Sequence, residues 1–150
     1  MNYLYAAMAF ACGSIVPVQA AINATLRTHL PSSMQAALVS FTVGTIALLL
    51  YVIAERSPMP SASSLAQVPW WGWIGGVLGA FFVFSSLVVV PKLGAAAMLA
   101  IIVAGQMTSS LLMDHYGVLN LAQQAITPVR VLGVALVIGG AALVTLAPGK

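Results

Sequence analysis

Long stretches without any charged residue limit most strongly what this chain can fold into. Its 150 residues include only two acidic and five basic side chains, and four of the uncharged runs between them exceed 20 residues. A helix of about 20 apolar residues crosses a bilayer, and a soluble domain carries about 25% charged residues where this chain has 5%. The sequence therefore excludes a soluble domain, a nucleic-acid binder and a disordered tail, and it indicates a polytopic membrane protein. The charged residues are Arg27, Glu55, Arg56, Lys92, Asp114, Arg130 and Lys150.

Five apolar segments are long enough to be membrane spans. None shows the ten-residue alternation of apolar and polar residues that marks a barrel strand, so we expect an all-α membrane protein. A polar loop broken by Pro58 and Pro60 follows the second segment, and a mildly apolar linker precedes the fifth. The expected spans of this single transmembrane domain are residues 3–26, 34–54, 70–90, 93–113 and 129–147.

The N-terminal segment is expected to remain as the first helix. No Lys or Arg lies near Met1, which argues against a cleaved signal peptide. Cys12 is the only cysteine, so no intrachain disulfide can form. The preceding Ala9-Phe10-Ala11 is a poor match to a lipoprotein cleavage site.

The basic residues barely specify an orientation. With five spans, the face that holds the N-terminus carries Arg56 and Arg130, and the other face carries Arg27, Lys92 and Lys150. This small excess favours an outside N-terminus and an inside C-terminus. All seven Trp and Tyr residues lie toward the N-terminal face, so two copies inserted in opposite directions would place an aromatic belt on both faces. An antiparallel pair of this kind and a single orientation set by a partner remain alternatives. The aromatic residues are Tyr3, Tyr5, Tyr51, Trp70, Trp71, Trp73 and Tyr116.

The first span holds the clearest candidates for a substrate pathway. Gln19 and Asn23 are four residues apart and share one helix face. Pro17 removes a backbone hydrogen bond just before them, and Ser14 lies a turn earlier. Such a helix suits a polar pathway, and buried amides that join two helices are an equally good interpretation. Other neutral polar residues within the spans are Ser40, Thr42, Thr45, Ser85, Ser86 and Thr108.

Gln106 is the corresponding candidate in the fourth span, followed by Ser109 and Ser110. Gln19 and Gln106 lie at similar distances from the C-terminal ends of their spans, about 10 Å at 1.5 Å per residue, and these two ends are expected on opposite membrane faces. In an antiparallel pair, Gln19 of one copy and Gln106 of the other would share one depth in the membrane.

Glycines at helical spacing favour close helix packing, and a moving hinge is the minority interpretation. They form two overlapping pairs in the third span and one pair seven residues apart in the fifth. These residues are Gly72, Gly75, Gly76, Gly79, Gly133 and Gly140.

Asp114 and His115 end the fourth span. They are interpreted as solvated helix-end residues, and a proton relay or a salt-bridge cap is the sharper alternative. The sequence contains no catalytic triad, no metal-spaced cluster of Cys and His, and no carboxylate deep in a span. We therefore expect neither an enzyme nor a metal or other cofactor.

Several strings of this sequence together match a known family over essentially the whole chain. The strings are Pro17–Ala24 with Leu26, Trp71–Ala80, Pro91–Ala96, Gly105-Gln106 and Asp114–Gly117. On these strings, the chain resembles the YdcZ-like family of the drug/metabolite transporter superfamily, near the EamA-type transporters.

The resemblance implies a five-helix unit equivalent to half of a ten-helix inverted-repeat transporter in a bacterial inner membrane. It also implies a homodimer or a pair with a paralogue. Small multidrug relatives exchange protons on a glutamate of the first helix, and residues 1–26 contain no acid, so that mechanism is not carried over. We expect a dimeric exporter of an unidentified small molecule that works by alternating access, with a neutral or zwitterionic cargo. A non-transporting membrane scaffold or partner subunit is the alternative.

Overall fold

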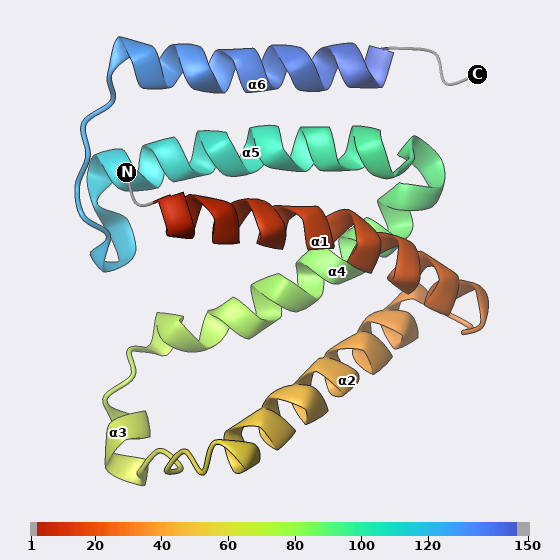
Figure 1. The fold of residues 1–150 in the computed structure, drawn as a ribbon, viewed down its shortest axis with the longest axis vertical. Coiled ribbons are helices and arrows are strands. Elements are labelled where there is room, and N and C mark those ends of the chain that lie inside the picture. The colour runs from red at the N-terminus through yellow and green to blue at the C-terminus, as the bar shows by residue number, and fades with distance from the viewer. Residues whose placement is uncertain (1–2, 147–150) are drawn as a thin grey trace. The chain divides into compact units, whose positions relative to one another are not determined.

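Five long helices make up most of the protein. The computed structural model describes residues 3–146, so Lys150 and the expected end of the last span at Ala147 lie outside the described residues. Within this range the chain is helical and has no strand (Figure 1). The five helices long and apolar enough to cross a membrane confirm the expected all-α, five-span class. They are α1 (Tyr3–Thr28), α2 (Ser33–Ala54), α4 (Ile74–Leu93, entered through the 3₁₀ turn η1 at Trp70–Trp73), α5 (Ala95–Tyr116) and α6 (Pro128–Leu146).

The boundary between α4 and α5 follows a glycine rather than the proline and lysine beside it. The expected third span ended before Pro91, but α4 continues through Pro91 and Lys92 because a proline in the last turn removes only one backbone donor. The break comes at Gly94, whose φ of 77° is left-handed, so α5 begins at Ala95 and not at Leu93.

The other ends differ from expectation by a few residues. Helix α1 extends through Arg27 to Thr28, and α5 extends past Asp114 to Tyr116. Helix α6 starts at Pro128, where the missing N–H costs nothing. The loop expected over residues 57–64 contains the start of a short helix, α3 (Ala62–Ala66), because the Ser61 hydroxyl caps it by accepting from the Ser64 N–H at 3.1 Å.

The described residues form two compact units, one ending at Pro91 and the other beginning at Lys92. The single domain expected from the sequence stays a prediction. In the first unit, small residues of α2 pack on α4: Ala36, Ala37, Val83 and Leu87 form the buried cluster. The turn from α1 to α2 is tied by Arg27, whose side chain donates to Leu30 O at 2.7 Å and to Ser33 Oγ at 3.0 Å.

The second unit is a pair of antiparallel helices, α5 and α6, that lie side by side (Figure 1). Val134 and Ala141 of α6 are both buried. They are seven residues apart, so they share the helix face that packs in this unit.

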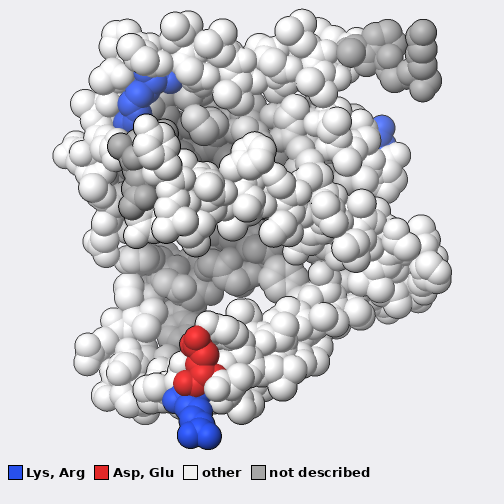
Figure 2. Space-filling model, viewed as in Figure 1, with Lys and Arg blue, Asp and Glu red and all other residues white. Residues whose placement is uncertain are grey.

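Most of the protein surface is apolar. Figure 2 shows one face on which charged side chains occupy only a few isolated places. The Trp and Tyr residues stand at or near helix ends, and all except the half-buried Trp71 are exposed, with Tyr3 at the start of α1, Trp70 in η1 and Tyr116 at the end of α5. This distribution is typical of a surface that faces lipid, with amphipathic rings at the interface.

Candidate functional site

A groove of mixed polarity opens between α1, α2 and α4 of the first unit. Its volume is about 210 Å³. The Gln19 amide contributes from α1, and the Ser40 and Thr45 hydroxyls contribute from α2. The Thr45 hydroxyl donates to Phe41 O at 2.8 Å, whereas within residues 3–146 neither the Gln19 amide nor the Ser40 hydroxyl has a hydrogen-bond partner. The groove is lined by Gln19, Ser40, Phe41, Gly44, Thr45, Leu48 and Val83.

The groove lies near the middle of the spans that form it. Gly44 is close to the midpoint of α2, which runs over 22 residues from Ser33 to Ala54. Gly44 also leaves space, since apart from its chain neighbours and the backbone of its own helix no described atom lies within 4 Å of where its Cβ would be. No charged residue lines the groove. Its chemistry is therefore that of amides and hydroxyls at a depth where unpaired polar groups are costly.

The other candidate residues of the first span precede or follow Gln19 along α1 and do not line the groove. Asn23 is only 5% exposed, one turn closer to the α1–α2 turn than Gln19. Pro17 lies inside α1 without ending it. The Ser14 hydroxyl donates to Phe10 O at 2.9 Å, within its own helix. Of the four, Gln19 is the residue that the fold places together with polar groups of another helix.

The candidate residues of the fourth span belong to the second unit, where they do not line one common groove. Gln106 and Ser109 are exposed on α5. Ser110 borders a different groove, of about 370 Å³, with Asp114 and Arg130. The remaining lining residues of that groove are Met107, Leu111, Gly133 and Val134.

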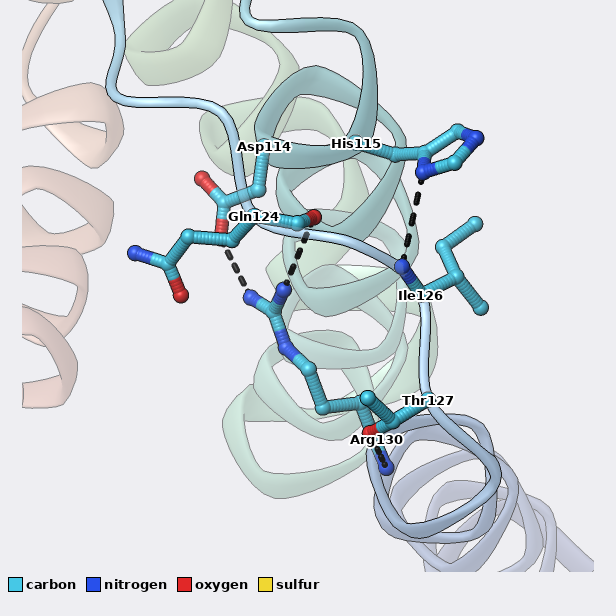
Figure 3. A network of polar contacts seen from close by, with 6 residues as sticks. All are labelled: Asp114, His115, Gln124, Ile126, Thr127 and Arg130. Carbon is cyan, nitrogen blue, oxygen red and sulfur yellow. Dashed lines mark hydrogen bonds and ion pairs between the residues drawn. The ribbon is translucent and has the colours of Figure 1, made fainter.

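An ion pair between Asp114 and Arg130 joins the ends of α5 and α6 (Figure 3). Arg130 Nη2 donates to Asp114 Oδ2, and Arg130 Nη1 donates to Gln124 O at 3.3 Å. The Gln124 N–H donates to Asp114 O at 2.8 Å. Both side chains are about one-third exposed, at 31% for Arg130 and 27% for Asp114. Arg130 thus holds α5, α6 and the linker between them at once.

His115 bonds to the linker and not to Asp114. Its Nδ1 accepts from the Ile126 N–H at 3.4 Å (Figure 3). Its carbonyl accepts from Gln123 Nε2 at 3.0 Å. Gly117, in the left-handed conformation at φ 57°, ends α5 and turns the chain back toward these contacts. These contacts tie His115 to the linker, and the role of Asp114 and His115 in a proton relay or a cap stays a prediction.

The glycines chosen as packing residues have different surroundings. The Cβ position of Gly79 lies 3.5 Å from Phe41 Cζ, so this glycine allows α2 and α4 to approach. The Cβ position of Gly72 meets Val68 of the preceding loop. For the other four, no described atom lies within 4 Å of the Cβ position, and their packing role stays a prediction. They are Gly75, Gly76, Gly133 and Gly140.

Comparison with known proteins assigns the family. The chain matches the family described as "Putative inner membrane exporter, YdcZ" over residues 4–143. This chain belongs to the YdcZ family. The protein named "Inner membrane protein YdcZ" from Escherichia coli (strain K12) is 40% identical over 52 residues, which are 35% of each chain. No solved structure matches the chain.

Membership of the YdcZ family and five spans make this a multi-pass inner-membrane protein. The family description points to export rather than catalysis. Four residues of the polar groove were not anticipated from the sequence: Phe41, Gly44, Leu48 and Val83. The available signal was the four-residue spacing of Ser40, Gly44 and Leu48, which places them on one face of α2.

Proposed function

We propose that this YdcZ-family chain exports a small molecule as a dimer by alternating access, with the Gln19 groove as part of the substrate site. One observation carries the proposal: unpartnered amide and hydroxyl groups of two helices meet near mid-span, in a groove with no charge. Transporter sites form near the bilayer midplane at the junction of repeated units. Groups of this kind would bind a neutral or zwitterionic cargo.

Replacing Gln19 or Asn23 with alanine is expected to lower transport. Proteoliposomes would be loaded with a panel of neutral and zwitterionic metabolites, and efflux would be followed by mass spectrometry. For Gln19, which lines the groove, loss of one hydrogen bond to the cargo corresponds to a drop of about 3–10-fold. For Asn23, which is buried one turn away and does not line the groove, a smaller drop is expected. Gln67→Ala is the matched control, since Gln67 lies in the exposed loop between α3 and η1. Unchanged efflux in both site variants would assign these residues to helix packing, and a panel with no exported compound would favour the scaffold.

The dimer is proposed to be antiparallel. The lengths of α1 and α5 support a shared depth for the two amides: Gln19 lies nine residues before the end of α1 and Gln106 ten before the end of α5, about 14 and 15 Å. These ends lie on opposite membrane faces, because successive spans alternate in direction.

Terminal tags probed from each side of the membrane are expected to report both orientations. On a Cys12→Ala background, cysteines at positions 19 and 106 carried by different copies should then crosslink. A single location for every C-terminus would exclude the antiparallel homodimer and point to a paralogue of opposite orientation. Crosslinking confined to one copy would contradict the shared depth.

A further inference from the structure

The first unit has a second groove, beside the polar one and different from it in chemistry. It lies between α2 and α4 and has a volume of about 570 Å³. No charged or polar side chain lines it, and three of its residues are phenylalanines. The lining residues are Met34, Ala37, Leu38, Phe41, Val77, Ala80, Phe81 and Phe84.

Phe41 lines both grooves and forms the wall between them. Its ring lies over Gly79 of α4, 3.5 Å from where the Cβ of that glycine would be. Phe41 as a residue is nevertheless 37% exposed. One side of this wall therefore offers the Gln19 amide and the Ser40 hydroxyl, and the other offers an aromatic and aliphatic surface of larger volume.

We propose that the cargo is a neutral amphipathic molecule, with a hydrogen-bonding group in the polar groove and an aromatic or aliphatic body in the apolar groove, divided at Phe41. This inference rests on the proposed function and names its substrate class. The shared wall argues for one occupant of both grooves, because a molecule in either one contacts Phe41. The cargo is neutral because neither groove has a charged lining residue to balance a buried charge.

Variants that fill one groove at a time test the polar and the apolar part of this site independently. Gly44→Leu places a side chain in the polar groove, where no described atom lies within 4 Å of the Cβ position. Ala80→Leu places one in the apolar groove, from an exposed position. Gly139→Leu is the matched control, since Gly139 is on α6 of the other unit and its Cβ position is also free of described atoms.

The probe is 4-fluorophenylacetamide, which joins a neutral carboxamide to an aromatic ring. Its binding to the full chain in lipid nanodiscs would be measured by fluorine NMR against empty nanodiscs. We expect Gly44→Leu and Ala80→Leu each to weaken binding at least about tenfold, the scale of one lost hydrogen bond or part of a buried ring. Fluoroacetamide should respond to Gly44→Leu alone, and Gly139→Leu should leave all binding unchanged.

Probe binding that is insensitive to Ala80→Leu would overturn the inference. In that case native mass spectrometry would show what fills the apolar groove: a phospholipid lost in Ala80→Leu assigns it to an acyl chain, and a dimer lost in that variant assigns it to a second copy. Probe binding as expected with no exported compound would leave the amphipathic site standing and refute export. Export of compounds that lack any apolar body would leave export standing and refute the amphipathic site.

Discussion

Gly44→Leu is expected to reduce export to the level of protein-free liposomes while the protein still folds and inserts. The substitution fills the centre of the polar groove, where Gly44 stands between Ser40 and Leu48 on one face of α2. A cargo cannot then reach the Gln19 amide, whatever its affinity for the remaining groups. The loss should exceed that of Gln19→Ala, which removes one contact and leaves the space open.

Folding should tolerate the added side chain. Gly44 is inside a helix, where leucine is more favourable than glycine by up to about 1 kcal/mol, and its Cβ position is free of described atoms. Membrane insertion and resistance to detergent unfolding would be compared with those of Gly139→Leu. Wild-type export by well-inserted Gly44→Leu protein would place the pathway outside this groove.

Arg130→Leu is expected to produce the largest loss of stability, about 1–3 kcal/mol, measured from the midpoint of unfolding in a denaturing detergent. The range lies between that of exposed ion pairs and that of fully buried ones, because both partners are about one-third exposed. The variant leaves the Asp114 carboxylate without its partner and frees the linker carbonyl of Gln124.

Arg56→Leu is the matched control for charge. Arg56 belongs to the same expected membrane face, is exposed, and has no ion pair within residues 3–146. Asp114→Leu with Arg130→Leu should cost less than the sum of the two single variants, because the double variant leaves no unpaired charge. Additive losses would show that the two residues stabilise the protein independently.

The number of spans follows from the spacing of charged residues along the sequence. The residues at which the helices end do not follow from it. Any sequence with uncharged apolar runs of this length must satisfy its backbone hydrogen bonds within helices. A charged residue at a helix end can still be accommodated in the last turn, as Lys92 and Asp114 are. Left-handed backbone at Gly94 and Gly117 terminates these helices, and the sequence alone does not show which glycines adopt it.

The candidate site shows a similar division. The Gln19–Asn23 pair is visible in the sequence because four residues make one helical turn, a purely local relation. Three features join residues from different helices: the groove that Gln19 shares with the α2 hydroxyls, the place of Phe41 in both grooves, and the Asp114–Arg130 pair. Such contacts depend on how side chains of neighbouring helices interlock, and a scarcity of charge constrains this packing very little. Charge spacing therefore determined that the chain crosses the membrane five times, whereas helix packing decided which neutral groups face one another within it.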